Sequence, residues 1–404
     1  MAHSIDTGFG LRLYLTYVFF MVSIGLLDAV TIYKASSQLG ADPMYLGILS
    51  FLWSLFYIIS TAVFGPLGDN YKIRVLTAIS SSLMISSMLS ILFSDSLSII
   101  AVGYILHAIA SSAGHIAISI DVMENKDPEE WGYINHILKG LYWIFRGVFI
   151  YFSLTAGYQD LLVMALIIIA SIHLLVIPQV FFRRAIYRAE LTLEKIYGSI
   201  VLRGLTITSI LERKPGNLHT IEALWGWFKS NGNPLFTAIS ASMLAMAFEL
   251  IITPSPPILI RGMGSQGLAM YLYTSPILVG LSMLIITPLL RDPIQVFVRR
   301  TSLAISILSG FALAISYRDS SHGIPLAFPL ITFALSYQLS ELDAYYKYSS
   351  ITAGYDMGRY LAIREIGGLV GGILSGYIAT VYGYMASIIV GMILIVISQI
   401  VRML

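Results

Sequence analysis

The chain has 404 residues, of which 57% are hydrophobic and only 11% are charged. A soluble globular protein carries roughly 25% charged residues, so this composition excludes a chain whose whole surface faces water. Cysteine is absent, which excludes disulfides and cysteine-ligated metals, and the net charge of +2 carries little information. Most of the surface is therefore expected to face lipid.

A membrane-spanning helix needs about 20 mostly apolar residues. Such stretches follow one another along the chain, and Val381-Tyr382-Gly383 is the expected turn between the last two. We predict helices at residues 11–33, 44–66, 75–93, 97–121, 133–155, 161–182, 233–257, 266–290, 301–317, 323–343, 359–380 and 384–403. The predicted fold class is an all-α polytopic membrane protein with twelve transmembrane helices.

The basic residues predict the orientation of these helices. With a cytoplasmic N-terminus, 19 of the 24 Lys and Arg residues fall on inner segments, and three fall in outer loops, namely Lys34, Arg261 and Arg318. Inner loops of membrane proteins are enriched in basic residues, so we expect a cell-membrane protein with both termini in the cytoplasm. Residues 183–232 are hydrophilic, and we expect a cytoplasmic linker with amphipathic helices; a regulatory docking site is the alternative.

The parts of the chain on either side of this segment repeat each other at an offset of 221 to 223 residues. The matching pairs are Pro66 and Pro288, Asp69 and Asp292, Asp121 and Asp343, and Asp28 and Glu249. Asp121 and Asp343 end their predicted helices. Internal repeats are the usual construction of secondary transporters. We therefore predict two pseudo-symmetric six-helix bundles, residues 1–182 and 233–404, joined by the linker 183–232.

The segment at the end of the second predicted helix carries a motif. It runs Gly65-Pro-Leu67-Gly-Asp69-Asn-Tyr-Lys72-Ile-Arg74. This resembles the signature loop of the major facilitator superfamily, in which Gly, Leu and Asp precede a basic cluster at the start of the third helix. The match is partial, because Asn70, Lys72 and Ile73 stand where the family usually has a basic residue, a glycine and a basic residue. No subfamily is identified.

In that family the loop acts as a cytoplasmic latch. The resemblance implies this role for Gly65, Asp69, Arg74 and Asp121, with the Asp of the loop capping a helix of the other bundle and the basic residue pairing with the acid of the fourth helix. A carboxylate at a helix N-terminus and a short charge relay stabilise the closed state by about 1 kcal/mol each. The alternative is an ordinary basic inner loop with a solvated Asp69.

Several ionisable residues lie within predicted helices, and the candidates for a functional site among them are Asp28, His107, Lys139, Arg146 and Glu249. Ionisable groups facing lipid cost about 2.5–3.5 kcal/mol, so they usually face a cavity and mark function. Helical spacing places some of them on two polar stripes, which are His136, Lys139, Trp143 and Arg146, and Tyr104, His107, Ser111 and His115. All four groups Asp28, His107, Arg146 and Glu249 are near enough to the bilayer centre to meet there.

We expect these five residues to contact the substrate or to couple transport to protons. Asp28 and Glu249 are the candidate proton carriers, and Arg146 or Lys139 either neutralises them or binds an anionic group of the substrate. The alternative is a structural ion pair between helices, and for His107 a hydrogen bond to a neighbouring helix.

Two further patterns concern packing. Gly367, Gly368, Gly371, Gly372 and Gly376 predict a close helix crossing rather than a phosphate loop. The prolines at 254, 256 and 257 predict either the end of the seventh helix or a gating kink within it.

The function that the resemblance implies is a secondary active transporter, which moves a small solute by alternating access and is coupled to protons. A membrane-embedded enzyme and a transport-inactive receptor or scaffold are the alternatives. We expect a monomer that is not an enzyme. Its expected partners are the lipid bilayer, a proton and a small-molecule substrate of unknown class, for which an anion is one option. No nucleic acid, cofactor or metal is expected.

Overall fold

The computed structural model describes residues 7–69, 73–125, 128–155, 159–176, 234–286, 293–318, 326–352 and 357–403. Within those ranges it contains twelve α-helices and one π-helix, and no strand. The first group comprises α1 (Thr7–Tyr33), the π-helix η1 (Lys34–Gln38), α2 (Pro43–Asp69), α3 (Ile73–Leu92), α4 (Leu97–Asn125), α5 (Pro128–Thr155) and α6 (Gln159–Leu175). The second group comprises α9 (Pro234–Ile252), α10 (Ser255–Ile286), α11 (Pro293–Arg318), α12 (Ala327–Thr352), α13 (Met357–Val381) and α14 (Tyr384–Met403).

Length and hydropathy make these helices suited to a membrane. Eight segments of the described residues are long and apolar enough to cross one, and the segment 234–285 among them joins α9 and α10. Helix α6 is apolar but shorter, and α12 and α13 do not belong to this set. Both carry charges in their interiors, including Glu341 in α12 and Arg364 in α13. The chain is a multi-pass membrane protein, and the charges inside α12 and α13 must be covered by other helices.

Several helices extend beyond the ends predicted from hydropathy. Helix α4 continues to Asn125 and α12 to Thr352, so the predictions that Asp121 and Asp343 end these helices are wrong. Hydropathy marks the edge of the apolar layer, whereas backbone hydrogen bonding continues through charged residues that reach water or a partner. The turn before α14 is confirmed, with Gly383 at φ 86°, a conformation that glycine adopts without steric cost.

The seventh predicted helix ends earlier than expected. Helix α9 stops at Ile252, so the predicted end at residue 257 is wrong. Pro256 and Pro257 lie in the first turn of α10, where a missing backbone N–H leaves no helical hydrogen bond unmade. The prolines therefore separate two helices rather than kink one. The chain bends again at Gly264, whose φ is 70°, within α10.

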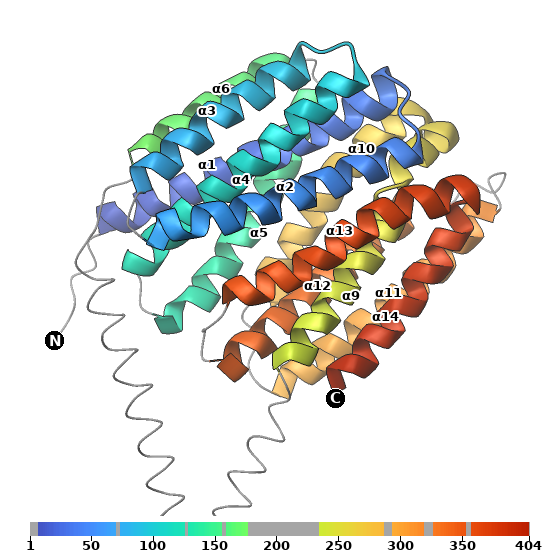
Figure 1. Ribbon diagram of the computed structural model, residues 1–404. Coiled ribbons are helices and arrows are strands. Elements are labelled where there is room, and N and C mark those ends of the chain that lie inside the picture. The colour runs from blue at the N-terminus through green and yellow to red at the C-terminus, as the bar shows by residue number, and fades with distance from the viewer. Residues whose placement is uncertain are drawn as a thin grey trace, which may run out of the picture.

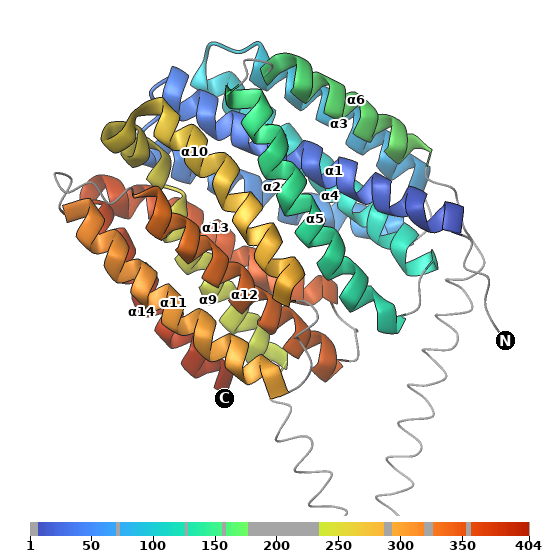
Figure 2. The same cartoon turned by 180° about the vertical axis from the view of Figure 1, so that it is seen from behind.

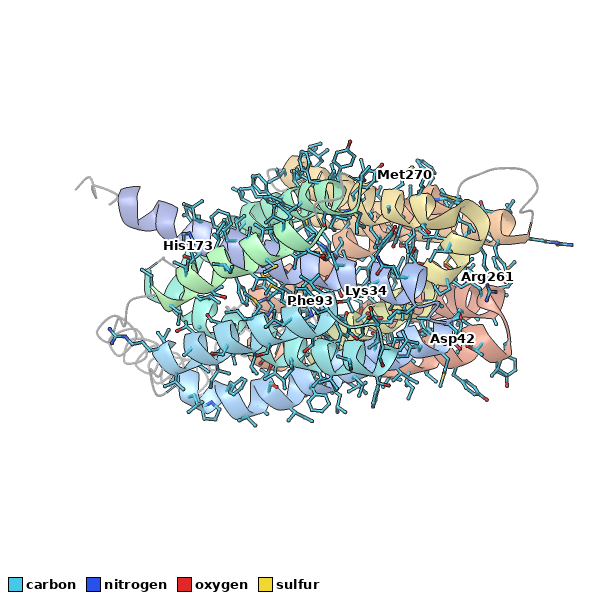
Figure 3. The ribbon with its side chains drawn as sticks, turned by 90° about the horizontal axis from the view of Figure 1, so that it is seen from above. Lys34, Asp42, Phe93, His173, Arg261 and Met270 are labelled. Atoms are coloured by element: carbon cyan, nitrogen blue, oxygen red, sulfur yellow. The ribbon has the colours of Figure 1, made fainter. Side chains whose placement is uncertain are left out.

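The three basic residues that were assigned to outer loops lie in helices instead. Lys34 is in η1, Arg261 in α10 and Arg318 at the end of α11. Lys34 is only 8% exposed, and its Nζ donates a hydrogen bond of 2.6 Å to the carbonyl oxygen of Leu92, the last residue of α3. A cation stabilises the unpaired carbonyls of a helix C-terminus. Figure 3 shows Lys34 among the packed helices and Arg261 at the edge of the molecule.

The helices gather into two bundles that lie side by side (Figures 1 and 2). Helices α1 to α6 pack on one another, as do α9 to α14, and the bundles touch mainly where α2 meets α13 and where α5 meets α10. The prediction of two six-helix bundles is confirmed. The boundaries of the two domains and the linker 183–232 lie outside the described residues, so they stay predictions.

Glycines make both contacts between the bundles close. A Cβ added to Gly47 of α2 would lie 2.6 Å from the carbonyl oxygen of Gly372 on α13. A Cβ added to Gly280 of α10 would lie 2.5 Å from the carbonyl oxygen of Gly140 on α5. Without side chains at these positions the helix backbones approach one another directly, which lets short polar groups nearby reach across the interface.

The glycines of α13 serve two contacts at once. Gly372 and Gly376 face α2, where a Cβ on Gly376 would lie 2.9 Å from the Cα of Met44. Gly371 faces α9, where its Cβ would lie 2.8 Å from the Cα of Met246. The predicted close crossing is confirmed, and α13 is held tightly between a helix of its own bundle and a helix of the other.

Candidate functional site

An ion pair joins α1 and α5 inside the first bundle. Arg146 Nη2 donates a hydrogen bond to Asp28 Oδ2 at 2.9 Å. The Tyr104 hydroxyl on α4 donates to the other carboxylate oxygen, Oδ1. The side chains of Asp28 and Arg146 are 23% and 15% exposed. The fold therefore brings together two of the five predicted ionisable residues, and Tyr104 from the second polar stripe joins them.

The Arg146 guanidinium is fixed by its own helix as well as by Asp28. Its Nη1 donates to the Tyr142 hydroxyl at 3.0 Å, and its Cζ lies 5.0 Å from the centroid of the Trp143 ring. A Cβ added to Gly25, one turn before Asp28, would lie 2.7 Å from Arg146 Cδ, so glycine makes room for the arginine against α1. Arg146 Nε is buried and has no hydrogen-bond partner among the described residues.

This arrangement can change state in two chemical ways. A proton on Asp28 would remove the negative charge opposite Arg146, and an anionic ligand could replace Asp28 as the partner of the guanidinium. Leaving one member of a buried pair without its partner costs about 3–5 kcal/mol, so either event strongly favours a new arrangement of nearby groups.

His107 lies one turn beyond Tyr104 on α4. Only 1% of the residue is exposed, and neither ring nitrogen makes a well-aligned hydrogen bond within the described part of the chain. Its ring centroid lies 5.6 Å from that of Tyr104 and 6.4 Å from that of Trp53. His107 is thus packed among aromatic rings next to the ion pair and forms no ion pair with Asp28.

Glu249 on α9 has a different environment from Asp28, its counterpart in the repeat. Its Oε2 accepts a hydrogen bond of 2.8 Å from the Ser50 hydroxyl, which belongs to α2 in the other bundle. The Thr253 hydroxyl, just past the end of α9, donates to the same oxygen. Asp28 is paired within its own bundle, whereas Glu249 is hydrogen-bonded across the interface and does not meet Arg146.

A second charged cluster lies in the second bundle. Arg364 on α13 places its Nε 2.6 Å from Glu341 Oε1 on α12 and its Nη1 3.1 Å from Glu365 Oε2. The Ser54 hydroxyl on α2 donates to Glu365 Oε1 at 2.8 Å. Ser54 lies one helical turn from Ser50, so neighbouring turns of α2 reach two carboxylates of the other bundle.

Lys139 on α5 faces this second cluster rather than Asp28. Its Nζ lies 5.5 Å from the centroid of the Tyr345 ring on α12. The charges that act on it most strongly are those of Glu341 and Arg364. Lys139 and Arg146 are seven residues apart on α5, about 10 Å along the helix axis, so they serve two clusters at different depths.

The comparisons with known proteins rest on structure. No family model matches the sequence, and no curated protein matches it. A crystal structure of a POT family transporter in complex with 5-aminolevulinic acid is 16% identical with a TM-score of 0.63, and the match covers 98% of this chain and 95% of that one. A partially occluded, inward-open xylose transporter XylE from E. coli is 13% identical with a TM-score of 0.60, covering 96% and 98%. The human organic anion transporter MFSD10 is 11% identical with a TM-score of 0.60, covering 97% and 98%.

This chain has the major facilitator fold. The resemblance first seen in one loop extends over the whole chain, because each match covers nearly all of both proteins. At identities below 25% the likeness establishes the fold.

The structure gives the helix positions of the four predicted latch residues but does not describe all of their side chains. Gly65 and Asp69 lie in the last turns of α2, so Asp69 is helical rather than beyond the predicted end at residue 66. Arg74 lies in the first turn of α3 with its side chain exposed. Asp121 lies within α4, four residues before its end. The side chains of Asp69 and Asp121 lie outside the described set, so the latch stays a prediction.

Sequence reasoning missed Glu341, Arg364 and Glu365. The predicted helices ended at 343 and began at 359, which placed these charges near helix ends, where charges are ordinary. The sequence did contain a signal for them. If two consecutive helices extend beyond their predicted ends, the carboxylates and the arginine a few residues from those ends become interior residues, and interior charges need partners. Helix α12 does extend further, and that extension makes Glu341 an interior residue.

Proposed function

We propose that this chain is a secondary active transporter that moves a small solute across the cell membrane by alternating access. The observation that carries the proposal is a set of charged side chains at the interior of both bundles of a major facilitator fold, from Asp28 and Arg146 to Glu341 and Arg364. Charges within membrane helices are costly and usually mark substrate or ion pathways. Matched structures are named as transporters of peptides, xylose and organic anions, which supports the same class of activity.

The contacts between the bundles fit a rocking motion. The hydrogen bonds from Ser50 to Glu249 and from Ser54 to Glu365 have donor and acceptor on different bundles, so separation of α2 from α9 and α13 must break them. Hydroxyl–carboxylate hydrogen bonds are worth about 1.5–3 kcal/mol each, which is small enough to be exchanged for water or ligand during a transport cycle.

Proton coupling is the second element of the proposal. Asp28 and Glu249 are the proposed proton carriers, and Arg146 responds to the charge of Asp28. Protonation of Asp28 would release the guanidinium, and protonation of Glu249 would weaken its hold on Ser50. Each event favours a different arrangement of the helices that carry these residues.

The remaining proposals concern the setting of the transporter. Both termini and the linker 183–232 lie in the cytoplasm, the protein works as a monomer, and Asp69 with Arg74 and Asp121 forms the cytoplasmic latch. The basic residues of the inner segments support this orientation. The chain is proposed to alter no covalent bond of its substrate.

Transport into proteoliposomes tests the proposed function. Vesicles loaded with a pH-sensitive dye receive the purified protein and are exposed in turn to amino acids, peptides, sugars and carboxylates. We expect at least one class to move protons together with solute, and Asp28→Asn to abolish that coupling. A solute that binds but never enters the vesicles would favour a receptor, and a chemically altered solute would favour an enzyme.

A further inference from the structure

Two oppositely charged side chains from different bundles, Lys139 and Glu341, lie near Tyr345 and could each accept a further charged partner. Lys139 Nζ has no carboxylate within ion-pair distance among the described residues, and its contact there is with the face of the Tyr345 ring. Glu341 uses Oε1 for Arg364, and its Oε2 has no hydrogen bond within the same set. The Lys139 ammonium is nevertheless close enough to Glu341 for their charges to interact.

Arg364 is placed to release one carboxylate and keep another. It lies 2.6 Å from Glu341 and 3.1 Å from Glu365, and Glu365 is also held by Ser54. If Glu341 turned to a new cation, Arg364 would retain Glu365 and would not be left as an unpaired buried charge. That exchange avoids leaving a buried arginine without a partner, which is strongly destabilising.

The charge balance of this group selects the ligand. Lys139 and Arg364 carry two positive charges, and Glu341 and Glu365 carry two negative charges, so the group is neutral as a whole. An anion or a cation bound here would add a net charge to a partly buried site, and a net charge in a low-dielectric region is costly. A molecule that carries both charges leaves the site neutral.

We propose that Lys139 and Glu341 bind a small zwitterion, with its carboxylate on the Lys139 ammonium and its ammonium on the free oxygen of Glu341. This deepens the proposed function, because it names the substrate class of the transporter. Arg364 acts as a positioning residue that holds Glu341 before the ligand arrives. Since Lys139 lies on α5 and Glu341 on α12, the ligand would connect the two bundles and favour a state in which they are close on this side.

Binding to the purified protein tests the inference without requiring transport. The probes are ω-amino acids of increasing length, from glycine through β-alanine and 4-aminobutyrate to 6-aminohexanoate. Butyrate and butylamine are the matched compounds with only one charge. We expect one member of the series to bind at least about tenfold more tightly than either matched compound, because each singly charged compound leaves one protein charge unpaired.

Two substitutions identify the residues. Lys139→Gln should weaken zwitterion binding about tenfold or more and should shift the preference toward butylamine, whereas Glu341→Gln should shift it toward butyrate. Lys139→Arg and Glu341→Asp keep the charges and should retain most of the binding. Arg261→Gln and Asp95→Asn, which change exposed charges elsewhere, are the controls.

The proposal is overturned if no ω-amino acid binds, or if butyrate binds as tightly as 4-aminobutyrate. It is also overturned if Lys139→Gln and Lys139→Arg lose binding equally while both remain folded by size-exclusion chromatography, because charge would then not be the recognised property. Zwitterion binding without flux would contradict the proposed transport and leave this site standing. Flux of another solute without zwitterion binding would support the proposed transport and overturn this site.

Discussion

Asp28→Asn is the substitution that separates a proton carrier from a structural ion pair. Asparagine keeps an oxygen that can accept the hydrogen bond of Tyr104. It removes the negative charge that lies 2.9 Å from Arg146 and so imitates a permanently protonated carboxyl group. The change therefore alters one interaction, the ionic one, and leaves the shape of the side chain almost unchanged.

The surroundings of Arg146 set the size of the effect. Removing one partner of a fully buried pair costs about 3–5 kcal/mol. Arg146 keeps its hydrogen bond to Tyr142 and its contact with the Trp143 ring, and its side chain is 15% exposed, so part of the charge stays solvated. We therefore expect a loss of roughly 2–3 kcal/mol, which lowers the apparent melting temperature by roughly 5 °C.

The double variant Asp28→Asn, Arg146→Gln completes the test. It contains no unpaired charge at this position, so we expect most of the lost stability to return. Stability is measured by tryptophan fluorescence of the purified protein during heating, with the exposed Asp95→Asn as the control. If Asp28 carries the coupled proton, both the single and the double variant should bind solute yet fail to accumulate it in response to a pH gradient.

Two results would refute this reasoning. An unchanged melting temperature of Asp28→Asn would mean that the ion pair contributes nothing to the fold. Recovery of both stability and gradient-driven accumulation in the double variant would rule out Asp28 as the proton carrier and leave it as the structural partner of Arg146.

Three further predictions concern topology, the latch and the contact between bundles. Tags inserted at residue 200 and at the C-terminus should both be accessible only from the cytoplasm, and an external C-terminus would contradict the proposed orientation. Asp69→Asn should slow flux more than it weakens substrate binding, since the residue is proposed to bias a conformational equilibrium; equal losses would argue against a latch. Gly47→Ala should lower the melting temperature by the equivalent of about 1–3 kcal/mol, because its Cβ would meet the Gly372 carbonyl oxygen at 2.6 Å, whereas Gly262→Ala, with 3.9 Å of room, should not. Equal stability of these two glycine variants would mean that α2 and α13 adjust freely.

Sequence alone determined the class of the fold and the order of its helices along the chain. The bilayer requires long apolar stretches with internally satisfied backbones, and that requirement is visible in a single sequence. The repeat and the loop from Gly65 to Arg74 then indicated the major facilitator arrangement. Residue pairs were also visible where they depend on helical spacing, as for Tyr104 and His107 on one stripe of α4.

Only the tertiary structure decided which charges meet. Asp28 and Glu249 look equivalent in the repeat, yet one pairs with Arg146 inside its bundle and the other receives Ser50 from the opposite bundle. The difference depends on how each helix is rotated and how closely it approaches its neighbours, and glycines such as Gly25 and Gly371 set that approach. A sequence fixes the position of a charge along its own helix, but the partner across a helix crossing depends on angles and distances that arise only when all the helices pack together.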